Sequence, residues 1–122
     1  MPSTAITPRI ISRPRSRDVR LVAVSADRSF LWKHAYGLQS MFIENTTANA
    51  VTGGIDFGTT DGGAEIISGF AVGASALLAV TDAALLKRIL SMTVDTTVYL
   101  TATTAWNSAS LNVWLNFIKL AP

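Results

Sequence analysis

The one histidine of the chain, His34, is the first side chain whose chemistry would suit catalysis. Imidazole serves as a general base beside a serine nucleophile, yet the sequence has no Gly-x-Ser-x-Gly element to present such a serine. His34 also lies in an alternating, strand-like run, so we interpret it as a structural or surface histidine. A transition-metal site needs several histidine, cysteine or clustered acidic ligands. With one histidine and no cysteine, no such site is expected.

Acidic residues come closest together in and just after a glycine-rich segment over residues 53–63. The spacing of Asp56, Asp61 and Glu65 does not match a calcium loop, which needs oxygen ligands at alternate positions and a glutamate at its end. The segment also lacks the Gly-Lys-Ser/Thr ending of a phosphate-binding loop. We interpret Asp61-Gly62-Gly63 as a turn in which glycine supplies a positive φ. The sequence therefore predicts a protein that is not an enzyme and that holds no cofactor or metal.

The amino-terminal segment gathers most of the positive charge. Residues 1–33 carry seven basic and two acidic side chains, whereas residues 34–122 carry three basic and six acidic ones. Three prolines lie within the first fourteen residues, and each removes a backbone donor and disfavours helix just before it. Residues 1–17 are therefore predicted to form an extended basic arm outside a single domain over residues 18–122.

Three interpretations of the arm compete. It is a frayed terminus, a nucleic-acid-binding segment whose arginines neutralise phosphates, or a segment that docks on an acidic protein surface. The arm has no interleaved aromatic residues and the remainder of the chain is acidic, which disfavours nucleic acid. Its two isoleucines supply an apolar anchor, and arginine forks suit carboxylates, so docking is favoured. The residues expected to make this contact are Arg9, Ile10, Ile11, Arg13, Arg15, Arg17 and Arg20.

Two tryptophans are candidates for a partner or oligomer interface. Trp106 lies beside Asn107 in an expected loop, and Trp114 shares its strand face with two asparagines. Each either covers one end of the core or anchors an interface, where tryptophan is enriched. The sequence is compatible with a core cover or an interface anchor at each of the two tryptophans.

The elements that must position these residues are short strands. From Asp18 onward, apolar and polar residues alternate with a period of two between turn residues, which marks strands with one buried face. Strands are expected over residues 18–25, 29–36, 38–45, 54–59, 64–72, 75–80, 91–94, 97–103 and 110–120. Many short strands at such spacings indicate an antiparallel sandwich or barrel.

One segment departs from the strand pattern. Between Thr81 and Leu90, four apolar residues share one helical face, Asp82 suits the N-cap, and Lys87-Arg88 suits the carboxyl end of a helix dipole. This pattern predicts a single short helix.

Composition limits the remaining possibilities. A chain of 122 residues suits one domain, and no apolar run reaches the ~18 residues of a membrane span. Charged residues make up only 15% of the chain, against about 25% in an average protein. Few groups are thus available to hydrate the surface, so we expect a partner to cover part of it.

Two segments carry a family resemblance, IENTTANAVTGGIDFGTTDGG over residues 43–63 and YLTATTAWNSASL over residues 99–111. Through them, the chain from Ser40 onward resembles small structural proteins of tailed-bacteriophage particles, in particular capsid cement or decoration proteins. The resemblance implies a jelly-roll-like β-sandwich that trimerises on the outer shell. Related sequences occur in head-fibre and tail-fibre modules. The arm is not part of the resemblance.

These observations together predict a virion structural protein on the capsid surface. It would cement neighbouring copies of the major capsid protein as a homotrimer, with no nucleic-acid or membrane partner. The alternative is a receptor- or carbohydrate-binding module of a head or tail fibre. Its candidate site is Trp106 with Asn107, an aromatic residue flanked by polar groups.

Overall fold

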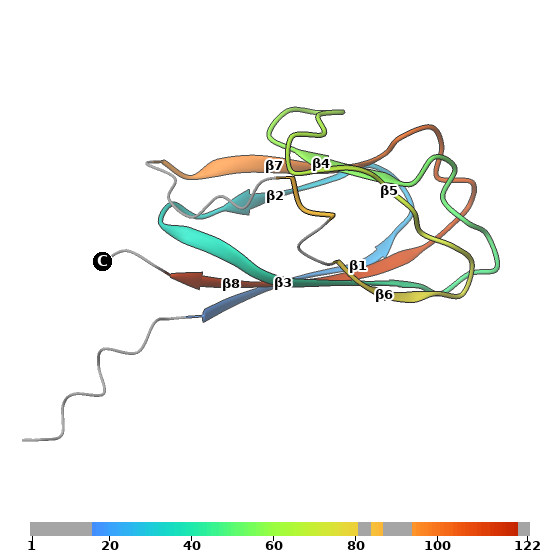
Figure 1. The fold of residues 1–122 in the computed structure, drawn as a ribbon, viewed down its shortest axis with the longest axis horizontal. Helices are drawn as coiled ribbons and strands as arrows, with labels where there is room; N and C mark the ends of the chain where they lie inside the picture. The colour runs from blue at the N-terminus through green and yellow to red at the C-terminus, as the bar shows by residue number, and fades with distance from the viewer. Residues whose placement is uncertain (1–15, 81–83, 87–93, 120–122) are drawn as a thin grey trace, which may run out of the picture.

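The computed structural model describes residues 16–80, 84–86 and 94–119. They form two four-stranded antiparallel sheets packed as a sandwich (Figure 1), so the predicted all-β sandwich is confirmed. The strands are β1 (Ser16–Val24), β2 (Arg28–Trp32), β3 (Tyr36–Asn45), β4 (Ile55–Gly58), β5 (Ile67–Phe70), β6 (Leu77–Ala79), β7 (Thr96–Ala102) and β8 (Leu111–Lys119). One sheet has the order β1-β8-β3-β6 and the other the order β2-β7-β4-β5.

The core lies between the two sheets and follows the alternation of the strands. In β8, the four residues Leu111, Val113, Leu115 and Phe117 are all buried, while the residues between them face outward. Aromatic rings fill the middle of the core: the Trp32 ring meets the edge of Phe117 with centroids 4.7 Å apart. The buried Trp32 indole donates from Nε1 to the Tyr36 carbonyl at 2.7 Å, which satisfies its polar atom.

The strand expected over residues 29–36 is two strands joined by a turn. β2 ends at Trp32 and β3 begins at Tyr36, whose N–H donates to the Lys33 carbonyl at 3.3 Å. Ala35 takes a φ of 67° in this turn. The turn residues Lys33, His34 and Ala35 include no glycine, proline or asparagine, and Ala35 is buried. The sequence pattern therefore did not reveal where the chain crosses to the other sheet.

The predicted short helix is wrong where the structure describes it. Ala84–Leu86 has turn and bend geometry, and the remainder of residues 81–90 lies outside the described residues. The Leu86 N–H donates to the Ile66 carbonyl at 2.8 Å. This amide is therefore not available for the bond to the fourth preceding carbonyl that a helix requires. Tertiary contacts replace the helix here, because Ala84 and Leu85 pack directly against the core.

The start of β1, the segment before β7 and the glycine turn differ from or match the sequence predictions as follows. β1 begins at Ser16, so Arg17 belongs to a strand rather than to the arm. Residues 1–15 lie outside the described part of the chain. So do residues 91–93 of the strand expected over 91–94, and Val94 is not in a strand. The predicted positive φ in the glycine turn is confirmed, since Gly62 has a φ of 81°.

Loops gather at the end of the sandwich drawn on the right of Figure 1. Asn45, at the end of β3, ties two of them together. Its Nδ2 donates to the carbonyls of Asn49 at 2.7 Å and Gly73 at 3.0 Å, while its Oδ1 accepts from the Thr47 N–H and hydroxyl. Asn45 is buried. Its amide thus holds the β3–β4 loop against the β5–β6 loop.

No helix among the described residues is long and apolar enough to cross a membrane.

Candidate functional site

The outer face of the β1-β8-β3-β6 sheet presents two rows of side chains that cross three strands. Each row arises because alternate residues of β8 point outward and the strand register places a partner on either side. The first row is Arg20, Trp114 and Phe42, and the second is Asp18, Asn116 and Ser40.

A groove of about 400 Å³ lies along these rows. We call it the Trp114 groove, and it is lined by Asp18, Val19, Arg20, Ser40, Phe42, Trp114, Leu115 and Asn116. The first row gives it a wall that is aromatic apart from one guanidinium, and the second row gives it a carboxylate, an amide and a hydroxyl. The groove is therefore amphipathic across its width.

Contacts within the groove orient its side chains. The Arg20 guanidinium carbon lies 5.4 Å from the centroid of the Trp114 ring, a cation–π arrangement. Asn116 Nδ2 donates to Asp18 Oδ1 at 2.6 Å. Phe42 keeps 45% of its surface exposed. Among the described residues, the ion pairs involve other groups, so Arg20 makes no direct ion pair.

The structure brings together two of the residues predicted to meet partners, Arg20 and Trp114. Arg20, predicted to act with the arm, lies against Trp114. Arg17 is exposed on β1, and Arg9, Ile10, Ile11, Arg13 and Arg15 lie outside the described residues.

Trp106 lies apart from the groove, in the β7–β8 loop. Its ring is half-buried and packs against the core. Its Nε1 donates to Asp27 Oδ1 at 2.9 Å. These contacts match the interpretation of Trp106 as a cover over one end of the core, and they leave its indole N–H occupied.

Sequence reasoning missed four of the six residues in the two rows, namely Asp18, Ser40, Phe42 and Asn116. The signal for Asn116 was present, because it shares the outward face of β8 with Trp114. Phe42 carried a weaker signal, as an aromatic residue at a polar position of an alternating strand. No local pattern connects them with Asp18, because the pairing of β1 with β8 joins opposite ends of the chain.

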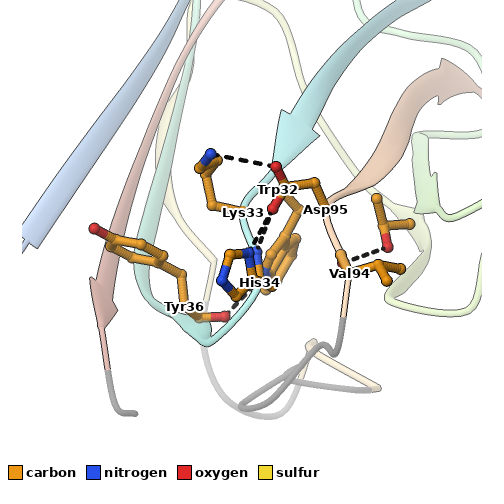
Figure 2. A network of polar contacts seen from close by, with 7 residues as sticks. Trp32, Lys33, His34, Tyr36, Val94 and Asp95 are labelled. Atoms are coloured by element: carbon orange, nitrogen blue, oxygen red, sulfur yellow. Dashed lines mark hydrogen bonds and ion pairs between the residues drawn. The ribbon is translucent and has the colours of Figure 1, made fainter. Parts of the chain in front are cut away.

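His34 belongs to a second polar cluster, at the β2–β3 turn (Figure 2). Asp95 Oδ1 accepts from the His34 backbone N–H at 3.0 Å and lies 2.8 Å from His34 Nδ1. Asp95 Oδ2 lies 3.2 Å from Lys33 Nζ. Hydrogen bonds from His34, above all that from its backbone N–H, hold the pKa of Asp95 well below its usual range, with a smaller contribution from Lys33.

The arrangement of this cluster fits a clamp on the turn. The hydroxyl of Thr96, next to Asp95 in the chain, donates to the Val94 carbonyl at 3.2 Å rather than to His34. Within the described residues, no three His, Cys, Asp or Glu side chains are grouped to hold a metal ion. Asp95 thus joins the β2–β3 turn to the segment that enters β7.

No protein-family model, curated protein or solved structure matches the chain. Function must therefore be inferred from the geometry of the chain itself.

The two segments over residues 43–63 and 99–111 lie side by side, although 35 residues separate them in the sequence. Thr52 forms a β-bridge with Ala105, and the Thr103 N–H donates to the Gly54 carbonyl at 2.9 Å. Asn107 Nδ2 donates to the Ala50 carbonyl at 3.0 Å. The segments thus form one structural unit at the loop end of the sandwich.

Proposed function

We propose that this chain is a virion structural protein: a jelly-roll module that attaches to the outside of a tailed-phage capsid and cements neighbouring capsid subunits without catalysis. The strand order is the observation that carries this proposal. In a jelly roll, the chain is a long hairpin wound into two sheets. The first strand therefore pairs with the last, the second with the second-to-last, and each following strand with its counterpart from the other end. The pairs β1·β8, β2·β7, β3·β6 and β4·β5 follow that rule.

Viral shells and lectins are two settings in which eight-stranded jelly rolls are used. The sequence resemblance over residues 43–63 and 99–111 favours the first setting, and these two segments form a single unit in the fold. The low charge of the chain, 15% of residues, also suits a protein whose surface is partly covered on a particle.

The arm is the proposed attachment to the capsid. It precedes Ser16, the first residue of β1, and an extended residue spans at most ~3.5 Å, so residues 1–15 reach on the order of 50 Å. That length suffices to cross from one capsid subunit to its neighbour. Exposed arginine–carboxylate pairs contribute up to about 1 kcal/mol each, so the attachment is collective and weakens with salt.

A proposed homotrimer contact lies at the edge strand β6. Leu77 is 69% exposed, and its strand pairs only with β3. An exposed apolar residue on an unpaired sheet edge is suited to meeting another chain.

Attachment is tested with purified phage particles from which the protein has been stripped. Deletion of residues 1–15 leaves β1 intact, and we expect the truncated protein to fold but to co-sediment weakly with particles. A full-length variant with serine in place of Arg9, Arg13 and Arg15 is the matched control for loss of charge without loss of length. Equal binding of the truncated and full-length proteins at every salt concentration would contradict the attachment proposal.

Copy number tests the position on the virion. Quantitative mass spectrometry of purified particles should find the chain at a stoichiometry comparable with that of the major capsid protein. A few copies per particle would instead support the head- or tail-fibre alternative.

A further inference from the structure

We infer that the Trp114 groove is a binding site for a neutral saccharide. The inference goes beyond the proposed function and does not depend on it, because it rests on the chemistry of the two groove walls. The volume of about 400 Å³ falls within the range of small-molecule pockets.

The aromatic wall matches the apolar face of a sugar ring. The faces of aromatic rings carry negative charge, and the C–H groups on one side of a pyranose present slight positive charge. Phe42 is 45% exposed and Trp114 is half-buried, so both rings lie at the protein surface. The Arg20 guanidinium lies over one face of the Trp114 ring, so the exposed Phe42 ring offers the main stacking surface and Trp114 flanks it.

The polar wall matches the hydroxyl groups of the same ring. A sugar hydroxyl both donates and accepts, so it is best met by donors and acceptors lying next to each other. On this wall Asp18 supplies an acceptor, and Asn116 and Ser40 supply both, while Arg20 adds donors from the aromatic row. The 2.6 Å bond from Asn116 Nδ2 to Asp18 Oδ1 holds two of these groups in place before a ligand arrives.

Other occupants fit this groove less well. The Asp18 carboxylate balances the charge of the Arg20 guanidinium, so the groove has no excess of positive charge to attract a phosphate or an acidic ligand. A lipid chain would leave the polar wall without partners. A peptide added as a strand would pair with the free edge of β1 and run beside it, whereas the groove crosses the outer face of the sheet over β1, β8 and β3.

The inferred saccharide site differs from the one that the sequence predicted. Trp106 packs against the core, and its indole N–H is bound to Asp27. Trp114 instead lies on a sheet face.

The test uses the full-length chain and a panel of soluble trisaccharides. The neutral probes are trimers of glucose, mannose, galactose and N-acetylglucosamine, and the acidic comparison is trigalacturonic acid. Binding is measured by saturation-transfer NMR and by titration of tryptophan fluorescence. We expect at least one neutral trimer to bind with a Kd of about 1 mM or tighter, and the acidic trimer to bind more weakly.

Three variants assign the binding to the groove. Trp114→Ala and Asn116→Ala should each weaken it by about tenfold or more. Trp106→Phe, which changes a tryptophan outside the groove, should leave it unchanged. Circular dichroism checks that each variant is folded, and Phe42→Ser serves as a second groove variant if Trp114→Ala does not fold.

The inference is overturned if no neutral trimer binds at about 10 mM, a concentration well above the expected Kd. It is also overturned if the groove variants bind as well as the wild type, or if the acidic trimer binds best. None of these outcomes depends on attachment to phage particles, so a failure here is distinct from a failure of the proposed function.

Discussion

Replacing the buried Asn45 amide by a carboxyl group should strongly destabilise the sandwich. Asn45→Asp keeps the size of the side chain and the Oδ1 acceptor that binds Thr47. It removes the two donors that bind the carbonyls of Asn49 and Gly73. Both carbonyls would then face an oxygen atom instead of an N–H.

The size of the effect follows from these contacts. Each lost hydrogen bond reduces stability by about 1 kcal/mol, and a buried polar group left without a partner adds about 1 kcal/mol or more. Asn45 is only 2% exposed, so water does not readily replace the lost donors. We expect a loss of about 3 kcal/mol in the free energy of unfolding at neutral pH. For a domain of this size, that loss lowers Tm by roughly 10 °C.

Urea denaturation followed by tryptophan fluorescence measures this loss at constant m-value. Asn107→Asp is the matched control, because Asn107 is exposed and its Nδ2 makes one hydrogen bond, to the Ala50 carbonyl. The free energy of unfolding of Asn107→Asp should fall by less than about 1 kcal/mol. If the two variants are equally stable, the Asn45 amide does not hold the loops together and our reasoning is refuted.

The pH dependence of Asn45→Asp supplies a second check. The carbonyls around the new carboxyl group favour its protonated form, so its pKa in the folded state should lie above the value of about 4 in the unfolded chain. The difference in free energy of unfolding between wild type and Asn45→Asp should therefore shrink as the pH falls through the folded-state pKa, and it should level off below about pH 4. A deficit that does not change with pH would contradict this electrostatic explanation.

Three further predictions concern other parts of the fold. The pKa of Asp95 is lowered in the folded state, so its contribution to stability is present above about pH 4 and is lost as the pH falls further. Asp95→Asn should remove that part of the acid sensitivity in thermal melts from pH 7 to pH 2, and an unchanged profile would contradict the role of the clamp. Gly54→Ala should lower the free energy of unfolding, measured by urea denaturation, by about 3 kcal/mol or more. The reason is that φ of Gly54 is +82° and a Cβ would lie 2.5 Å from the Phe70 carbonyl oxygen. The control is Gly62→Ala, where φ is +81° but the space around the residue is open, so the free energy of unfolding should fall by only about 1 kcal/mol. Equal losses in the two variants would show that the close contact between Gly54 and the Phe70 carbonyl is unimportant. Leu77→Lys should leave Tm within about 3 °C of wild type but abolish the proposed trimer in sedimentation velocity; a variant that still trimerises would place the contact elsewhere.

The sequence by itself determined the β class and the inward and outward faces of most strands. Alternation is a local property, because the pleat of an extended chain places successive side chains on opposite faces. The alternation in β8 therefore separates Leu111, Val113, Leu115 and Phe117 from Trp114, and the structure buries the first four while Trp114 lies on the other face. Likewise, Gly62 was predicted correctly because positive φ depends mainly on the residue's own lack of a Cβ.

The tertiary structure decided what local patterns do not specify. The apolar residues around Leu86 fit a helical face, but the Leu86 amide binds Ile66 from another segment. The alternation through His34 hid a turn because the chain changes sheets there. The Trp114 groove depends on Arg20, Phe42 and Trp114 meeting across three strands that lie far apart in the sequence. Such a register is set by long-range pairing of the strands and by burial of their common core face, so only the folded chain brings these side chains together.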